Sequence, residues 1–305
     1  MTAFVVVNPK AANTGRDWPK IKPLLESAFP LMQVVQSRAR GETALLVRKA
    51  LKEGHLDIIA VGGDGTINEA VNGFFENGTP VSPDAVFGFV PSGGACDFRR
   101  TFAIPQAHEA AIMRLKHSRI RRVDIGHIAC LSPKGQPVGR YFVNVASFGL
   151  RAQVAARTNR AGVAGLLGDS FHAFRALLGW HPQHVRLFTE ADYDEIAGIT
   201  DVAIANGRWF AHGVKVAPGA EPGDGLFDIV VVVGTGRRKL SALMRGWRAG
   251  NQPPENEIRR VRAVHLTAAP TLDTHGAVAV EADGESVGIL PATFQILPGA
   301  INIRC

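Results

Sequence analysis

Residues 57–69 of this chain, DIIAVGGDGTINE, restrict its fold more than any other stretch. The first five are mostly apolar, as in a buried strand, and apolar side chains after Thr66 recur at helical spacing. Between these two patterns lies the glycine-rich run Gly62-Gly63-Asp64-Gly65. The stretch therefore predicts a strand, a tight turn and the start of a helix.

The glycine-rich turn also predicts an anion site. Glycine lets the backbone approach a ligand closely, and a helix N-terminus offers N–H groups and a partial positive charge to a phosphate. Asp64 would add a carboxylate, which belongs beside phosphates if a divalent cation lies between them. The turn thus indicates a nucleoside triphosphate with Mg²⁺, and hence phosphoryl transfer. As an alternative, Asp64 could simply form the turn, since Asp-Gly is a common turn pair.

The first part of the chain alternates strands with helices, which predicts a doubly wound parallel sheet in an α/β nucleotide domain over residues 1–122. The turns after Val7, Val61 and Val90 each follow a strand and would line one cleft at the carboxyl ends of the strands. We expect strands over residues 4–7, 32–36, 56–61 and 86–90, and helices over 18–29, 42–53 and 106–116.

After about Arg122 the pattern becomes one of strands separated by turns, which predicts an antiparallel, β-sandwich-like domain over residues 123–305, whose last residues could return to the first domain. The two helical stretches expected there are 152–179 and 238–249. The expected strands cover residues 122–128, 140–146, 185–188, 201–205, 227–233, 263–268, 277–281 and 293–297.

The composition is that of a soluble globular protein, with 46% hydrophobic and 20% charged residues. No apolar run approaches the roughly 20 residues of a membrane helix, and the first residues read as a strand and not as a signal peptide. Three cysteines at unrelated spacings predict neither a disulfide framework nor a zinc site, so we expect a cytoplasmic protein. The net charge of +7 favours a nucleotide, nucleic acid or acidic lipid as partner, unless the basic surface has no specific role.

Five motifs occur in order along nearly the whole chain, and together they resemble the diacylglycerol kinase catalytic family, which includes bacterial lipid kinases, sphingosine kinases and ceramide kinases. The resemblance implies an ATP-binding α/β domain, a β-rich lipid-substrate domain and catalysis between them. The motifs are Asn8-Pro9-Lys10, Val61 to Glu69, Pro91-x-Gly93 with Asp97-Phe98-x-Arg100, Asp224-Gly225-Leu226-Phe227-Asp228 and Asp283-Gly284-Glu285.

The resemblance also implies roles for individual residues. Asp64 and Asp97 would organise Mg²⁺ and nucleotide, and Asp283 would be the general base that takes the proton from the lipid hydroxyl, with Glu285 close behind it. A second, structural Mg²⁺ would bind Glu221, Asp224 and the carbonyl oxygen of Leu226. The residues expected to bind nucleotide are Asn8, Pro9, Lys10, Gly62, Gly63, Asp64, Gly65, Thr66, Glu69, Gly93 and Gly94.

One stretch departs from the family pattern, which usually has Gly-Thr-x-Asn-Asp after the proline. Here Gly94 stands in the place of the threonine and Cys96 in the place of the asparagine. Backbone N–H groups could still hold phosphates. The loss of two side-chain contacts predicts altered nucleotide handling or weakened activity.

Three further segments allow two interpretations each. Residues 162–180 are apolar and could form a lid over a lipid chain or an ordinary helix pair. Basic side chains are frequent within residues 237–248 and recur at Arg259, Arg260 and Arg262. They could surround a helix that packs on the core, or they could hold the protein against anionic lipid. Residues 206–213 place aromatic side chains in a loop that could form a wall of the substrate site.

We therefore predict an ATP- and Mg²⁺-dependent lipid kinase, a transferase acting on diacylglycerol or on a sphingoid or ceramide lipid. It would be cytoplasmic and peripheral on an anionic inner membrane, without nucleic acid as a partner; homodimerisation stays open. Two alternatives remain: an NAD kinase-like enzyme with a soluble substrate, and a non-catalytic relative that binds nucleotide or lipid.

Overall fold

The computed structural model describes residues 2–11, 13–94, 96–161, 180–190, 193–234, 242, 245–247, 249–254 and 258–305. The chain divides into two compact units. Unit 1 comprises Met1–Ile125 and Pro298–Cys305, and unit 2 comprises Gly126–Leu297. Strands β7 (Ile120–Leu131) and β16 (Glu285–Arg304) contribute residues to both units.

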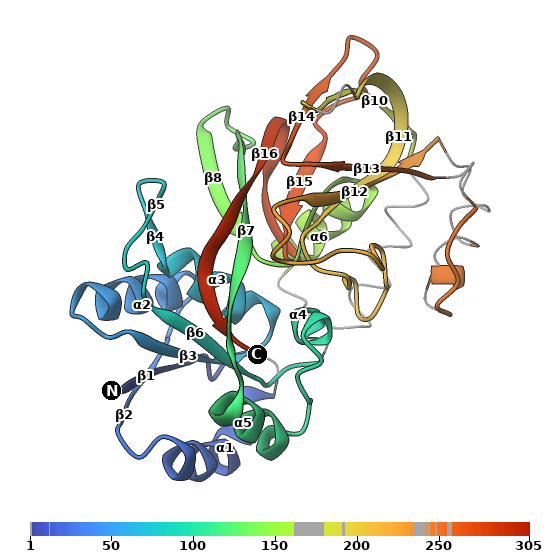
Figure 1. Ribbon diagram of the computed structural model, residues 1–305. Helices are drawn as coiled ribbons and strands as arrows, with labels where there is room; N and C mark the ends of the chain where they lie inside the picture. The colour runs from blue at the N-terminus through green and yellow to red at the C-terminus, as the bar shows by residue number, and fades with distance from the viewer. Residues whose placement is uncertain are drawn as a thin grey trace. The chain divides into compact units, whose positions relative to one another are not determined.

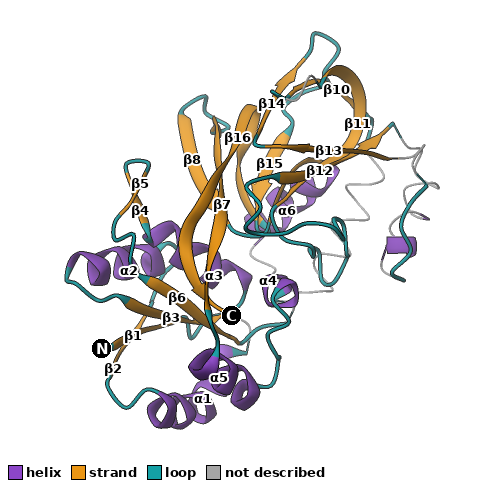
Figure 2. Ribbon diagram, viewed as in Figure 1, coloured by secondary structure: helices purple, strands orange, loops and turns teal. Residues whose placement is uncertain are grey.

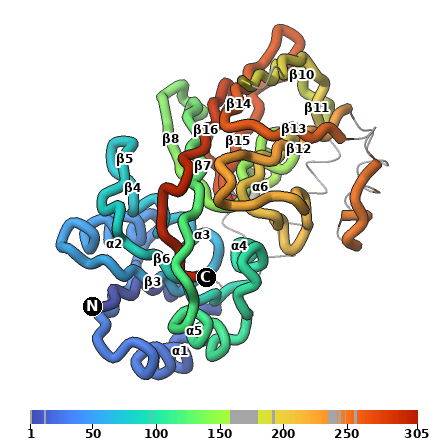
Figure 3. Tube along the Cα trace, in the orientation of Figure 1, coloured from blue at the N-terminus to red at the C-terminus, as the bar shows by residue number. Residues whose placement is uncertain are grey.

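Unit 1 contains a parallel sheet. Its strand order is β2 (Met32–Gln36), β1 (Ala3–Val7), β3 (Asp57–Gly62), β6 (Val86–Pro91) and the end of β16, where Asn302 pairs with Val86. Figure 3 shows this C-terminal strand end beside β6. A short hairpin of β4 (Phe75–Glu76) and β5 (Thr79–Pro80) lies outside the sheet.

Helices cover both sides of this sheet (Figure 1). Helix α1 (Thr14–Ala28) packs against α5 (His108–His117) on one side, and α2 (Glu42–Lys52) packs against α3 (Asp64–Gly73) on the other. The short helix α4 (Asp97–Thr101) follows β6. The strand β1 between these layers is apolar along its length, as a strand buried on both faces must be, and every residue of it is buried.

Unit 2 is built from antiparallel strands (Figure 2). One path through it runs β13-β12-β11-β10-β14-β16, and β9 pairs with both β11 and β15. Helix α6 (Leu150–Ala161) follows β9. The bounds are β8 Pro137–Phe142, β9 Val145–Gly149, β10 Gln183–Phe188, β11 Asp194–Ala205, β12 Phe227–Val233, β13 Ile258–Ala263, β14 His265–Pro270 and β15 Ala279–Ala282.

Four phenylalanine side chains lie in the core of unit 2 among mostly aliphatic residues. The rings of Phe142 and Phe227 stack with centroids 5.5 Å apart, and those of Phe148 and Phe294 stack at 5.8 Å. All four side chains are fully buried. Such ring pairs add to the free energy gained by burial.

Two expected single strands are in fact pairs of strands. Residues 140–146 divide between β8 and β9, because the N–H groups of Val143 and Asn144 bind the carboxylate of Asp283 and not a neighbouring strand. Residues 263–268 divide between β13 and β14 at Val264, whose N–H group binds the Glu190 side chain. The expected strand at 293–297 is the middle of the longer β16.

The two helical stretches expected in the second half fall partly outside the described residues. Of 152–179, the structure describes α6 as far as Ala161 and does not describe 162–179. Of 238–249, it describes residues 242, 245–247 and 249.

Candidate functional site

The two glycine turns of unit 1 lie side by side. Strands β3 and β6 are neighbours in register, with Gly62 opposite Pro91, and Ser92 N–H donates to Gly62 O at 2.9 Å. A Cβ atom added to Gly93 would lie 3.1 Å from Gly63 Cα. Because that distance is shorter than ordinary contact, the two backbones can approach this closely only without a side chain.

The side chain of Thr66 closes the first turn. A Cβ atom on Gly62 would lie 2.6 Å from Thr66 Cβ, so glycine is required there. Thr66 Oγ1 accepts a hydrogen bond from Asn8 Nδ2 at 3.2 Å, which connects the turn after β3 to the loop after β1. A third bond, from Thr14 Oγ1 to Ser92 O at 2.7 Å, connects α1 to the loop after β6. The three loops predicted to line a nucleotide site therefore lie together.

Asp64 and Asp97 also lie together. The two carboxylate oxygens of Asp64 accept the N–H groups of Asp97 at 3.0 Å and Phe98 at 3.2 Å, so Asp64 caps the N-terminus of α4. Asp97 is 4% exposed and forms an ion pair with Arg100 at 3.2 Å. Cys96, the residue before Asp97, has a φ of 44°. Burial, followed by the charge of Asp64, raises the pKa of its thiol well above the usual range.

Other residues predicted to bind nucleotide have structural contacts. Lys10 Nζ donates to Arg38 O at 2.7 Å, and Lys10 N–H donates to Asn8 Oδ1 at 3.1 Å. Glu69 is buried and accepts the N–H of Gly41, the residue before α2, at 2.8 Å. A Cβ atom added to Gly15 would lie only 2.6 Å from Pro9 O.

Gly65 and Gly94 complete the nucleotide-binding prediction. Gly65 lies in the first turn of α3. Around Gly94 there is open space, because an added Cβ would have no heavy atom within 4 Å. The nucleotide-binding roles of these residues remain predictions.

In unit 2, Asp283 and Gly284 form the turn between β15 and β16. Their φ angles are 49° and 85°, as in the hairpin turns that match strand twist. Asp283 Oδ1 accepts the N–H groups of Asn144 and Val145, each at 3.0 Å, and Oδ2 accepts the N–H of Val143 at 2.9 Å. Three bonds to a carboxylate fix its position and stabilise its negative charge.

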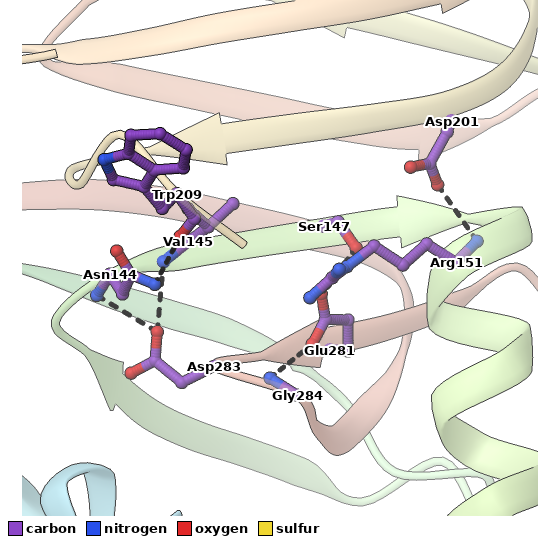
Figure 4. Close-up of polar contacts among 9 residues, drawn as sticks. All are labelled: Asn144, Val145, Ser147, Arg151, Asp201, Trp209, Glu281, Asp283 and Gly284. Carbon is purple, nitrogen blue, oxygen red and sulfur yellow. Dashed lines mark hydrogen bonds and ion pairs between the residues drawn. The ribbon is translucent and has the colours of Figure 1, made fainter. Parts of the chain in front are cut away.

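Glu285, the other predicted residue of this motif, is the first residue of β16 and lies opposite Ala282 in the ladder. Asn144 connects the turn to the loop of residues 206–213, called the aromatic loop below, because its Nδ2 donates to Trp209 O at 2.7 Å (Figure 4). The ammonium group of Lys215, which follows that loop, lies 5.3 Å from the centroid of the Trp209 ring.

A buried charged cluster beside this turn was not predicted from the sequence (Figure 4). Glu281 Oε1 accepts Ser147 Oγ at 2.8 Å and Arg151 Nε at 2.7 Å, while Oε2 accepts Gly284 N–H at 2.7 Å. Asp201 Oδ1 accepts the N–H of Arg151 at 3.2 Å. The available signal was a glutamate inside the otherwise apolar strand AVEA, since a buried charge needs a partner.

The residues predicted to hold a structural Mg²⁺ contact arginines. Glu221 forms an ion pair with Arg208, and Asp224 forms one with Arg262. The N–H of Leu226 donates to Asp224 Oδ1 at 3.0 Å. Two guanidinium groups therefore already neutralise both carboxylates, and the set fits a divalent cation poorly. Among the described residues, no group of three or more His, Cys, Asp or Glu side chains could hold a metal ion.

Two family models match the chain. The diacylglycerol kinase catalytic domain matches residues 2–128, and the YegS C-terminal NAD kinase beta sandwich-like domain matches residues 144–305. The chain belongs to the diacylglycerol kinase catalytic-domain family. This assignment to a family of lipid kinases agrees with the resemblance drawn from the five motifs.

Relatives of this lipid kinase family match most of the chain. A "Probable lipid kinase YegS-like" of Pseudomonas fluorescens is 28% identical, over 90% of this chain and 85% of the relative. A diacylglycerol kinase of Staphylococcus saprophyticus is 25% identical, over 99% of this chain and 94% of the relative. A solved diacylglycerol kinase structure from Bacillus anthracis shares the fold, with a TM-score of 0.71, 22% identity and coverage of 99% and 96% of the two chains.

These comparisons support ATP as the phosphate donor at the level of the kinase family. No helix within the described part of the chain combines the length and the apolar character needed to span a bilayer.

Proposed function

We propose that this protein transfers the γ-phosphoryl group of ATP to a hydroxyl group of a membrane lipid, either diacylglycerol or a sphingoid or ceramide lipid. The observation that carries this proposal is the junction of the two glycine turns in unit 1, where Gly63 approaches Gly93 and Asp64 binds the backbone of Asp97. The names of the relatives, which include diacylglycerol kinase, support a lipid acceptor.

The phosphates of ATP would bind at the start of α3. Its first hydrogen bond of helical spacing runs from Ile67 N–H to Gly63 O at 3.0 Å, so the N–H groups before Ile67 lie at the helix N-terminus. These groups and the helix dipole favour phosphate oxygens. The open space at Gly94 would admit them, and the loop that begins at Asn8 would form a second wall.

Mg²⁺ would bind through Asp64 and Asp97. Magnesium usually takes one or two protein carboxylates together with substrate phosphates, so two neighbouring acids suffice. To bind the ion, Asp97 would exchange its ion pair with Arg100 for the cation. When bound, the ion neutralises charge on the transferring phosphoryl group.

Asp283 would be the general base. It would accept the proton of the lipid hydroxyl as that oxygen bonds to the γ-phosphorus and the bond from phosphorus to the ADP oxygen breaks. Three backbone N–H groups orient the carboxylate before the lipid arrives, and such preorganisation is most of what a protein supplies in phosphoryl transfer. Glu285 would add a second carboxylate to the same turn.

The acceptor lies in a membrane, so the protein would act at the surface of an anionic inner leaflet. Its net charge of +7 favours such a surface. Sedimentation with vesicles should therefore show binding that increases with phosphatidylserine content and decreases with salt. Equal binding to neutral vesicles would contradict this part of the proposal.

The test of the proposed function is transfer of label from radiolabelled ATP to dioleoylglycerol, sphingosine or ceramide in mixed micelles. We expect one of these lipids to become labelled, and Asp64→Asn and Asp283→Asn to abolish labelling. The control is Asp194→Asn, since Asp194 lies in an exposed pair with Arg186. Labelling of NAD without lipid would indicate a soluble substrate, and ATP binding without labelling of any acceptor would indicate a non-catalytic relative.

A further inference from the structure

Glu281 is a fully buried acid two residues before the proposed base. It lies on β15, whose residues are otherwise apolar, and none of its surface is exposed. Its two oxygens accept three hydrogen bonds, from Ser147, Arg151 and Gly284. A buried carboxylate with this set of donors is strongly fixed, because any movement would leave a buried charge without its hydrogen bonds.

The bond to Gly284 restrains the turn itself. Ala282 pairs with Glu285 in the ladder, so Asp283 and Gly284 are the two residues outside it. The N–H of Gly284 donates to Glu281 Oε2 at 2.7 Å. Since Asp283 has a φ of 49°, which costs energy for a residue with a side chain, this bond helps to hold a conformation that the backbone would otherwise leave.

Arg151 connects this acid to three other elements. It lies at the start of α6, and its Nε donates to Glu281 at 2.7 Å in an ion pair. Its backbone N–H donates to Asp201 on β11, and its guanidinium carbon lies 4.0 Å from the centroid of the Phe210 ring. One side chain thus joins α6, β15 and the aromatic loop.

The ion pair of the cluster joins Arg151 and Glu281, whose Nε and Oε1 atoms lie 2.7 Å apart. Burial raises the pKa of the neighbouring Asp201 to about 8. Removing one member of a buried ion pair is costly, because the other charge is left without a partner in a low dielectric. Breaking the pair would therefore disturb the hairpin from which Asp283 extends.

We propose that Glu281, held by Arg151, is a positioning residue: it fixes the Asp283–Gly284 turn and so determines where the carboxylate of the base lies. This inference rests on the proposed role of Asp283 and extends it to a second layer of residues. Glu281 itself need not touch substrate. A displacement of about 1 Å at a reacting group can lower a rate by about 100-fold.

The test is Glu281→Gln, which keeps the size of the side chain. Glutamine has one acceptor oxygen, so it must lose either the arginine bond or the Gly284 bond, since both of these partners can only donate. We expect kcat with dioleoylglycerol, or with the lipid that wild type labels fastest, to fall about 10- to 100-fold at unchanged KM for ATP. Arg151→Lys, which keeps the charge but not the geometry, should lower kcat by less. Asp194→Asn again serves as the control, with unchanged kcat.

Two further measurements distinguish a positioning role of Glu281 from a purely structural role. Hydrogen exchange should show faster exchange of the Gly284 and Val143 amides in Glu281→Gln, with the amides of β9 and β11 unchanged. In the Asp283→Asn background, Glu281→Gln should lower residual activity no further, since a turn without a base has nothing to position.

Failure of this inference differs from failure of the proposed function. If Asp283→Asn is inactive while Glu281→Gln keeps both wild-type kcat and wild-type amide exchange, Glu281 positions nothing and the base assignment stands. If Asp283→Asn is fully active, the base assignment fails, and faster Gly284 exchange in Glu281→Gln would then show only that Glu281 holds the turn. The inference is also overturned if kcat of Glu281→Gln falls only in proportion to the fraction of the variant that is folded.

Discussion

Restoring the threonine that the family usually has at position 94 should tighten ATP binding. Gly94 tolerates the change: a Cβ there meets no heavy atom within 4 Å, and its φ lies outside the left-handed region. Replacing glycine at such a site also reduces the entropy of the unfolded chain, which stabilises a protein by about 0.4–1 kcal/mol. We therefore expect Gly94→Thr to fold at least as well as wild type.

The gain in affinity follows from one added hydroxyl group. A hydrogen bond to a charged group contributes about 1.5–3 kcal/mol, and each 1.4 kcal/mol is about tenfold in Kd. Ordering the threonine side chain offsets part of this, so we expect ATP binding to tighten about tenfold. The assay is titration calorimetry with ATP and Mg²⁺, alongside thermal unfolding of the same preparations.

Gly93→Ala is the matched contrast, because its Cβ would lie 3.1 Å from Gly63 Cα and push the two turns apart. It should weaken ATP binding, whereas Gly94→Thr should strengthen it. Equal ATP affinity in wild type and in both variants would refute the reasoning, since it would mean that neither glycine turn touches the phosphates.

Three other predictions concern the rest of the molecule. Arg262→Ala should uncover a cation site at Asp224, so that Mg²⁺ raises its melting temperature but not that of wild type; an equal shift in both would contradict this. Asp201→Asn should flatten the pH dependence of unfolding. Because the pKa of Asp201 is raised from its ordinary value of 3.8 to about 8, its neutral form stabilises the fold at low pH. This contribution is lost as pH rises from the ordinary pKa towards 8, by up to about 1.4 kcal/mol per pH unit. An unchanged slope in chemical denaturation between pH 6 and about 8 would contradict this. Gly62→Ala should cost about 1–3 kcal/mol of unfolding free energy because its Cβ clashes with Thr66, and a neutral result would show that Thr66 can move away.

Local sequence signals predicted the α/β character of the first half and the β-rich second half. The run from Asp57 to Glu69 carries its own strand, turn and helix signals; β3 lies within it and α3 begins within it. The strand at Met32–Gln36 has the bounds expected from its pattern. Such elements are predictable because neighbouring residues determine them.

Long-range contacts explain what the sequence did not reveal. The break between β8 and β9 is caused by a carboxylate about 140 residues away, and Arg151 and Glu281 are 130 residues apart. No local pattern announces such partners. The capping of α4 by Asp64 is of the same kind, since a turn residue of one loop binds the backbone of another.

The most direct test of the account is a single-turnover measurement with radiolabelled ATP and lipid, on wild type and Asp283→Asn. Asparagine suits the positive φ and keeps an oxygen for two of the three backbone N–H groups, so the turn should survive. We predict unchanged ATP binding and loss of phosphoryl transfer to the lipid by at least about 100-fold. Transfer at the wild-type rate would contradict the account.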